Sequence, residues 1–317
     1  MNPAAPYEDL SPDVVLDAVD AAGFETDGRL LALASYENRV YQVGIEGGSP
    51  LVAKFYRPAR WSDEAIAEEH AFALELAAAE LPVVAPLVID GRTLLAHAGY
   101  RLALYPRRGG RAPELESTDH LQWMGRLLAR LHGVGARARF RRRGAIDTDT
   151  FIREPARAAL ASGLLPERLH DAWRSRTGAI ATVIDARVAT LEPVARIRLH
   201  GDCHGGNVLW TDAGPHFVDL DDARMGPAVQ DLWMLAPSPR ALDALLDGYV
   251  EFRDFDHREL QLVEPLRLMR QIHWAGWVAA RWNDPAFPRA FAQVGEARWW
   301  EQHLNDLGEA LGRFEED

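Results

Sequence analysis

Three side chains with hard oxygen atoms stand close together in one segment of the chain, at Asp202, Asn207 and Asp219. Short apolar runs separate them, so the segment 199–222 is typical of a loop, a strand, a hairpin turn and a second strand. We expect their oxygens to converge at the ends of neighbouring strands. A carboxylate at Asp202 can accept a proton from an attacking hydroxyl. The oxygens of Asn207 and Asp219 suit Mg²⁺ held jointly with a nucleotide's phosphates, so the segment predicts a phosphoryl-transfer centre.

The spacing of these residues is similar to that of the protein kinase fold. His-x-Asp-x-x-x-x-Asn followed by an apolar strand ending in Asp is its catalytic and metal-binding pattern, and the variant with Gly after His resembles the aminoglycoside and choline phosphotransferase branch. Within that branch the chain resembles the stress response kinase A (YihE/RdoA-type) family over nearly its whole length. Four motifs carry this resemblance: S-Y-E-N-R-V-Y at 35–41, K-F-Y-R-P at 54–58, L-H-G-D-C-H at 199–204 and V-D-L-D-D-A-R at 218–224.

The resemblance implies a bilobal α+β fold of the protein kinase-like type. Residues 1–105 are expected to form a small N-lobe with a five-stranded antiparallel sheet plus a helix, and residues 106–317 a larger, mainly helical C-lobe. Strand-like runs occupy 29–35, 39–45, 51–56, 93–96 and 100–105, and the lobe's helices are expected at 12–22 and 62–80. Helical periodicity dominates afterwards, at 119–133, 167–191, 240–251, 258–282 and 296–314.

The resemblance also implies a nucleotide site on the N-lobe. ATP would contact Ser35, which is also a candidate phosphate acceptor, and the adenine would meet the hinge backbone at 104–106, around Tyr105. The chain departs from the usual kinase pattern here, because no G-x-G-x-x-G loop is present. The glycine-containing linker at 106–111 is compatible equally with a hinge between lobes and with a plain surface loop.

Lys54 is the only lysine among the 35 basic residues of the chain. Arginine serves everywhere else, so this lysine indicates a site where a compact ammonium is needed and a planar guanidinium does not fit. We expect Lys54 to reach the α and β phosphates of ATP, held there by a glutamate on the following helix. Glu69 is the expected partner, and the adjacent Glu68 is the alternative because helix phase does not decide between them.

Several polar groups near the predicted centre have two interpretations each. One of Asp221 and Asp222 binds a second ion or a water, or the two cap the turn at 226–227. His200 is expected to be structural. By the resemblance Asp231 accepts hydrogen bonds from the backbone of the catalytic loop; otherwise it is an acid at a helix N-terminus.

Two later features are expected to be structural. The basic segment 135–143 is interpreted as a solvated connector, with a docking patch for an acidic or phosphate-bearing partner as the alternative. The tryptophans of the last part of the chain are expected to make core and helix contacts, at Trp274, Trp277, Trp282, Trp299 and Trp300.

Composition limits the kinds of partner. A chain of 317 residues is long enough for two lobes. Its formal net charge of −12 argues against nucleic acid as the main partner. No uncharged apolar stretch approaches the length of a membrane-spanning helix, and no secretory signal is visible. The single cysteine fits a reducing compartment. We therefore expect a cytoplasmic monomer that binds neither nucleic acid nor a membrane.

The acceptor of the phosphoryl group stays open between two classes. The resemblance favours an ATP- and Mg²⁺-dependent serine/threonine protein kinase of a bacterial stress response. The alternative is a small-molecule phosphotransferase acting on an aminoglycoside, choline or a homoserine-like alcohol. Asp219 is followed by Leu-Asp instead of Phe-Gly, and the path to Pro227 is too short for a long activation loop. A non-catalytic nucleotide-binding scaffold is a third hypothesis, disfavoured by the intact Lys, Asp, Asn and Asp positions.

Overall fold

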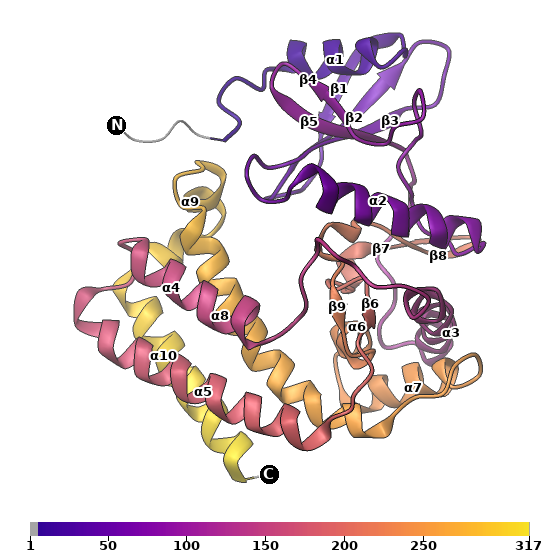
Figure 1. Ribbon diagram of the computed structural model, residues 1–317. Coiled ribbons are helices and arrows are strands. Elements are labelled where there is room, and N and C mark those ends of the chain that lie inside the picture. The colour runs from indigo at the N-terminus through magenta and orange to yellow at the C-terminus, as the bar shows by residue number, and fades with distance from the viewer. Residues whose placement is uncertain (1–5, 317) are drawn as a thin grey trace.

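The chain folds into two lobes (Figure 1). The computed structural model describes residues 6–316. The N-lobe holds one five-stranded antiparallel sheet with the strand order β1-β2-β3-β5-β4. Its strands are β1 (Thr26–Ala32), β2 (Arg39–Ile45), β3 (Leu51–Phe55), β4 (Leu95–His97) and β5 (Tyr100–Pro106). The α+β bilobal expectation, with a five-stranded antiparallel sheet in the small lobe, is confirmed.

Apolar residues on β3 and β5 build the small lobe's core with helix α1 (Pro12–Ala21). The hydroxyl of Ser11 caps α1 by accepting from the backbone of Val14. Strand β1 begins and ends three residues earlier than expected, and its register with β2 shifts between Thr26 and Leu30. Residues 33–38 lie outside the sheet and form a loop.

Helix α2 (Asp63–Ala78) connects the two lobes and lies beneath the sheet (Figure 1). Ser62 caps its first turn by accepting from the N–H of Ala65 at 3.2 Å. Phe72 and Leu76 belong to the core of the large lobe, so the helix is shared between the lobes. The helix ends before Glu80, whose φ of 57° is incompatible with continuing it.

The part of the C-lobe below α2 consists of short strands and three helices. Helix α3 (Thr118–Gly135) packs on α7 (Pro239–Tyr249), and its buried face carries the apolar residues that the periodicity predicted. Two short antiparallel pairs lie beside them, β6 (Ile197–Arg198) with β9 (Met225–Gly226), and β7 (Val208–Thr211) with β8 (Gly214–Phe217). Helix α6 (Val229–Leu235) follows directly and was missed by the sequence, because seven residues give little periodicity.

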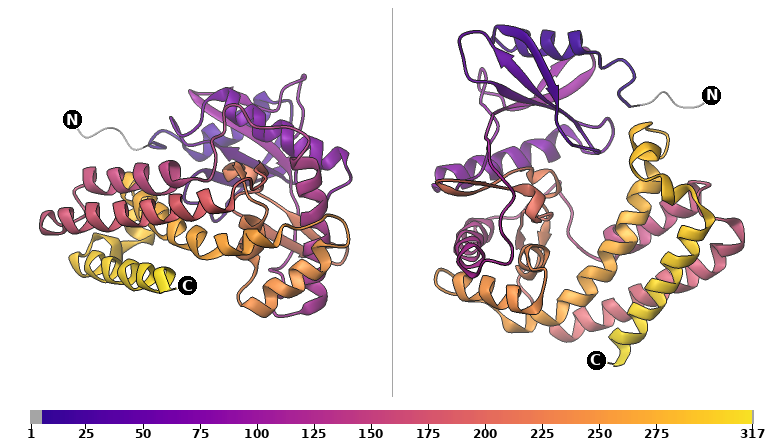
Figure 2. Two further views of the ribbon diagram at one scale, coloured as in Figure 1. Left: turned by 60° about the horizontal axis from the view of Figure 1, so that its bottom comes forward. Right: turned by 180° about the vertical axis from the view of Figure 1, so that it is seen from behind.

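The remaining helices form a bundle to one side of the strands (Figure 2). They are α4 (Glu154–Ala161), α5 (His170–Leu191), α8 (Val263–Ala280), α9 (Ala286–Ala290) and α10 (Ala297–Glu316). Short helices α4 and α9 were not expected, whereas α5, α8 and α10 agree with the periodicity to within a few residues. A 3-10 segment, His257–Leu262, accounts for the early start expected for α8. No helix within residues 6–316 is long and apolar enough to cross a membrane.

The basic segment 135–143 ends in a structural anchor. Arg143 is buried and donates to the backbone carbonyls of Ala65 and Ala223. Glu68 accepts the N–H groups of residues 141–143. The end of this segment is therefore fixed between α2 and the backbone at Ala223, and the expectation of a solvated connector is wrong for Arg143.

Candidate active site

The loop that leads into Asp202, beginning at His200, is held in shape by a buried carboxylate. Asp231 on α6 accepts the N–H of His200 and that of Gly201, both at 2.9 Å. Its Oδ2 also lies 3.1 Å from His132 Nε2, which donates to it. The role expected for Asp231 is confirmed, since this one side chain satisfies backbone donors of a loop that makes no regular ladder there.

His200 and Gly201 complete the same support. The ring of His200 is fully buried and its Nε2 donates to the carbonyl of Val218 at 2.9 Å, which ties the loop to the end of the hairpin. Gly201 has φ 84°, and a Cβ there would lie 2.1 Å from the carbonyl oxygen of Asp222. Only glycine fits this close approach. The structural role expected for His200 is confirmed.

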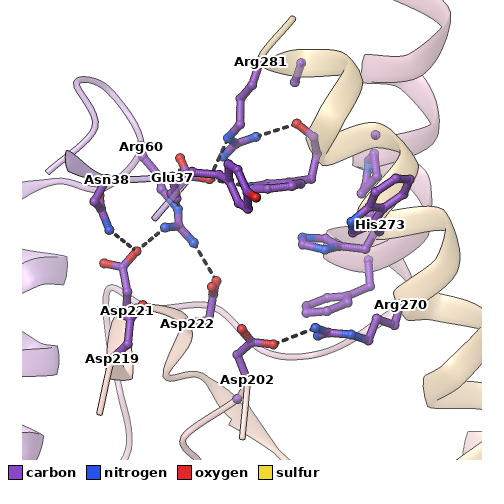
Figure 3. A pocket seen from close by; sticks show the side chains of 18 of the residues that line it. Glu37, Asn38, Arg60, Asp202, Asp219, Asp221, Asp222, Arg270, His273 and Arg281 are labelled. Carbon is purple, nitrogen blue, oxygen red and sulfur yellow. Dashed lines mark hydrogen bonds and ion pairs between the residues drawn. The ribbon is translucent and has the colours of Figure 1, made fainter. Parts of the chain in front are cut away.

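A cavity of about 770 Å³ opens in front of this loop (Figure 3). Asp202, Asn207 and Asp219 line one side of it, and we call these three residues the loop wall. Ser35 lies on the N-lobe side of the cavity, in the loop 33–38. The three residues that sequence spacing predicted to converge therefore share one space, although they are up to 17 positions apart in the chain.

Asp202 faces the cavity with a carboxylate held between two partners. Arg270 Nη2 lies 2.8 Å from its Oδ1, off the line of a good hydrogen bond, and His204 Nε2 lies 3.5 Å from its Oδ2. Burial opposes ionisation, yet the hydrogen bond from His204 and the charge of Arg270 lower the pKa of Asp202 below its ordinary value. Asp202 is therefore an anion at neutral pH, as an acceptor of a hydroxyl proton must be.

The donor atoms of Asn207 and Asp219 fit a divalent cation that prefers oxygen. The amide nitrogen of Asn207 donates a hydrogen bond to the Asp202 carbonyl at 2.9 Å. The amide oxygen of Asn207 is therefore available as a metal ligand. Asp219 has φ 60°, a left-handed conformation that Asp tolerates, and its carboxylate is half exposed in the cavity. Within residues 6–316 no three His, Cys, Asp or Glu side chains are grouped to hold a metal. Phosphate oxygens and water would have to complete the shell, as is usual for Mg²⁺.

Lys54 meets the loop wall from the N-lobe. Its Nζ lies 2.8 Å from Asp219 Oδ1 and 3.4 Å from Asp221 Oδ1. Burial disfavours the charged form, but these two carboxylates raise the pKa of Lys54 well above its ordinary value. With 7% of its side chain exposed, Lys54 is held as a buried cation.

The expected ion pair between Lys54 and Glu69 is not formed. Glu69 is buried on α2 and contacts His70 at 3.9 Å, while its Oε2 has no hydrogen-bond partner. Burial raises the pKa of Glu69 to about 7, so it is a weaker partner for Lys54 than the two aspartates. Glu68 is ruled out as the alternative, since it binds the backbone of residues 141–143 on the outer side of α2.

Tyr105 does not present its side chain to the cavity. Its hydroxyl lies 3.0 Å from that of Tyr56 and 3.5 Å from His70 Nε2, between the sheet and α2. Burial raises the pKa of Tyr105, so it stays a neutral phenol. A contact of the 104–106 backbone with adenine stays a prediction.

Asp221 and Asp222 are engaged by N-lobe cations. Arg60 contacts both carboxylates, with 2.7 Å to Asp222, and Asn38 donates to Asp221 at 3.1 Å (Figure 3). These contacts give the two acids a role that neither sequence interpretation included. The sequence also missed Asn38 and Arg60, although Asn38 stands within the 35–41 motif.

The side of the cavity opposite the loop wall comes from one face of α8 and the residue that follows it, which we call the α8 wall. Its residues line the same space: Arg270, His273, Trp274, Trp277 and Arg281. Trp274 and Trp277 therefore line the cavity in addition to packing on Phe291, which the core interpretation did not foresee. A helical face carrying both charges and tryptophans was the available signal.

The α8 wall is joined to the loop 33–38. Glu37 accepts from Trp277 Nε1 at 2.5 Å and pairs with Arg281 at 2.6 Å. Asp284, just after α8, pairs with Arg39 at 2.8 Å and with Arg57 at 2.5 Å. This loop is thus fastened to the C-lobe by ion pairs of low exposure.

Comparison with known families and proteins agrees with this geometry. Residues 29–263 match the model of the phosphotransferase enzyme family. The chain is 43% identical to stress response kinase A of Escherichia coli strain K12, over 98% of this chain and 95% of that protein. It is also 43% identical to the serine/threonine protein kinase RdoA of Salmonella typhimurium strain LT2, covering 93% and 91%.

Solved structures share the fold at much lower identity. An amicoumacin kinase in complex with AMP-PNP, Ca²⁺ and Ami has a TM-score of 0.70 at 18% identity, covering 92% of each chain. A microcompartment-associated aminopropanol kinase has a TM-score of 0.63 at 19% identity, covering 93% of this chain and 99% of that one. The chain therefore belongs to the stress response kinase A family within the phosphotransferase enzyme family.

Proposed function

We propose that this protein is an ATP- and Mg²⁺-dependent serine/threonine protein kinase of a bacterial stress response. Residues 1–105 would bind the nucleotide, and residues 106–317 would carry the catalytic loop and the acceptor. The observation that carries the proposal is the gathering of Asp202, Asn207 and Asp219 on one cavity wall opposite the buried cation Lys54.

Asp202 is the proposed base. The lowered pKa keeps its carboxylate ionised, and the backbone on either side is fixed by Asp231 and Asn207. An acceptor hydroxyl placed within hydrogen-bond reach would be oriented by this carboxylate and would transfer its proton to it as the bond to phosphorus forms. Little further covalent help is needed for phosphoryl transfer.

Asn207 and Asp219 are the proposed metal ligands, through the free amide oxygen and the exposed carboxylate. Bound Mg²⁺ would supply charge neutralisation at the phosphates. Lys54 and Asp219 neutralise one another without nucleotide. With a metal-bound nucleotide, the phosphates would become the partner of Lys54 and the metal ion that of Asp219. Lys54 would hold the phosphates, Ser35 would contact them from the loop, and Glu69 would be the partner available to Lys54 once Asp219 binds metal.

The acceptor is proposed to be a serine or threonine of a protein, as the name of the Salmonella typhimurium relative states for that protein. A small hydroxylated acceptor is the second candidate, because the nine residues 219–227 leave no room for a long activation segment. We further propose a monomeric, cytoplasmic protein. The only cysteine, Cys203, is buried as a free thiol, which fits a reducing compartment.

The test is transfer from γ-labelled ATP by the purified protein, alone, with generic protein substrates, and with a panel of amino alcohols. We expect label on protein, lost in Asp202→Ala. Label found only on a small molecule would favour the second candidate. ATP binding without transfer in any mixture would overturn both.

A further inference from the structure

Two guanidinium groups that have no role in the nucleotide chemistry above line the cavity, those of Arg270 and Arg224. Arg270 projects from the α8 wall towards the Asp202 carboxylate (Figure 3). Arg224 lines the same cavity from the segment that follows the hairpin. Neither residue belongs to the nucleotide machinery proposed above, so their charges need a separate explanation.

Arg224 is almost buried and poorly paired. Its nearest carboxylate is Asp222 at 3.7 Å, its Nε has no partner, and it donates no hydrogen bond to any residue in 6–316. Its guanidinium lies 5.1 Å from the ring centre of Trp61 and 5.3 Å from that of Phe151. Burial disfavours a cation without a full partner, and it lowers the pKa of Arg224. An incoming anion would satisfy this group.

In the absence of an acceptor, Arg270 is paired with Asp202, the proposed base. It lies 2.8 Å from Asp202 Oδ1, within the distance at which an acceptor hydroxyl must approach that carboxylate. Its side chain is 37% exposed, so it can turn to another anion without unfolding α8. The contact also lies off the line of a strong hydrogen bond, which makes it replaceable.

The other charges on this side do not cancel these two. Arg281 is already paired with Glu37, and Arg60 with Asp221 and Asp222. His273 lines the same side of the cavity and feels the charges of both Arg224 and Arg270. Burial, and after it the charge of Arg224, lowers the pKa of His273 to about 3, so its ring is neutral. Among the described residues that line this side, Glu154 on α4 is the one further acid.

We propose that the acceptor hydroxyl is flanked by a carboxylate and that Arg270 and Arg224 bind this carboxylate. The inference rests on the proposed function and names its substrate class: serine or threonine beside acidic residues. Binding moves Arg270 from Asp202 to the acceptor's carboxylate, which frees the base only when a suitable acceptor is present. An acceptor with an amine at that position is repelled by both guanidinium groups.

The test uses three peptides that differ only beside one serine, which is flanked by Glu, Gln or Arg. The quantity compared is the ratio of kcat/KM between the Glu and Gln peptides, because a general loss of activity cancels in it. For the wild type we expect a ratio of about ten or more, the size of a charge-assisted hydrogen bond, and poor use of the Arg peptide. Arg270→Gln should lower the ratio several-fold, with Arg224 left to bind the carboxylate, and Arg270→Lys should lower it less.

Arg267→Gln is the matched control, since Arg267 lies one turn earlier on α8, is 41% exposed, and pairs with Glu264 outside this cavity. It should leave the ratio and the activity unchanged. A wild-type ratio near one, or a ratio in Arg270→Gln equal to that of the wild type, would overturn the inference while leaving the protein kinase assignment intact. Label on an amino alcohol with none on any protein or peptide would overturn both.

Discussion

The two sides of the cavity are built in different ways. The loop wall presents oxygen atoms from the 18-residue stretch 202–219, and hydrogen bonds from Asn207 and to Asp231 fix the backbone at its start. The α8 wall presents arginines and tryptophans from one helical face, and it is held by ion pairs that reach across to the N-lobe. In our proposal, transfer chemistry therefore lies mainly in local sequence, whereas the choice of acceptor depends on how distant helices pack.

This difference predicts two kinds of variant. Changes at the loop wall or at its partner Lys54 should reduce transfer to every acceptor alike. Changes at the α8 wall should alter which acceptor is used, or how tightly the nucleotide is enclosed, and leave the transfer step itself largely intact.

Lys54→Met should have the largest effect. We expect kcat/KM to fall by about 10²–10³, the usual cost of losing one charged contact to the transferred group. Lys54→Arg tests the same site with the charge retained, and it should also lose most activity because a planar guanidinium does not fit where 7% of the side chain is exposed. Steady-state kinetics with any accepted substrate measure both. Near-normal activity in Lys54→Met would contradict the role of Lys54 as the partner of the loop wall in phosphoryl transfer.

Asp231→Asn should weaken the support of the loop that carries the loop wall. It removes one acceptor from the N–H groups of His200 and Gly201 and leaves His132 facing an amide, at a cost of about 1–3 kcal/mol in the free energy of unfolding. Activity should fall with it, by roughly tenfold, for all acceptors. Thermal unfolding and kinetics are measured beside Asp247→Asn, an exposed position on α7. An unchanged Tm would contradict the bracing role.

Asp284→Asn loosens the fastening of the α8 wall to the loop 33–38. Asp284 is 1% exposed and holds both Arg39 and Arg57, so its neutralisation leaves two guanidinium groups with weaker partners. We expect ATP affinity to fall by several-fold, with less change in kcat, because the loop covers the nucleotide side. Calorimetric titration against Asp254→Asn, an exposed site, distinguishes this from a general effect. Equal affinities would show that the fastening does not enclose ATP.

The smallest expected effect is on the pH dependence of stability, through Glu259, which accepts a hydrogen bond at the start of α6. Glu259 accepts the N–H of Val229 at 2.8 Å, and burial raises its pKa to about 7. The folded protein therefore keeps a proton that the unfolded chain releases between about pH 4.5 and 7, so this contribution to stability is present at low pH and lost as pH rises through 7.

Glu259→Gln removes the titrating group and keeps its shape. Relative to the wild type, the variant should gain about 1–2 kcal/mol in the free energy of unfolding between pH 5 and pH 8. Denaturant unfolding across that range measures the difference. A difference that does not vary with pH would contradict the raised pKa of Glu259.

The sequence predicted most of the loop wall because its determinants are close together. The order Asp202, Asn207 and Asp219, with an apolar hairpin between, is enough to bring three oxygen-bearing groups to one side. The brace from Asp231 came only from the family resemblance, and the structure agrees with it. The sheet was also predictable, apart from the early start of β1, where a register shift had no signal in the alternation.

The rest depended on packing that no local pattern encodes. Lys54 pairs with Asp219 instead of Glu69, because the relative placement of two lobes decides between them. Arg143 stands in a basic run, a pattern typical of solvent-exposed segments, and nothing in that pattern indicated that it is buried. Trp277 was interpreted as core, since helical spacing alone does not show whether a face meets other helices or a cavity.

The central proposal is that the loop wall holds a divalent ion together with ATP, and calorimetric titration of ATP at increasing Mg²⁺ tests it most directly. We predict that Mg²⁺ strengthens ATP binding to the wild type by about tenfold or more. This dependence should disappear in Asp219→Asn and Asn207→Ala, and remain in Asp212→Asn, an exposed position in the β7–β8 turn. The same Mg²⁺ dependence in all four proteins would contradict it.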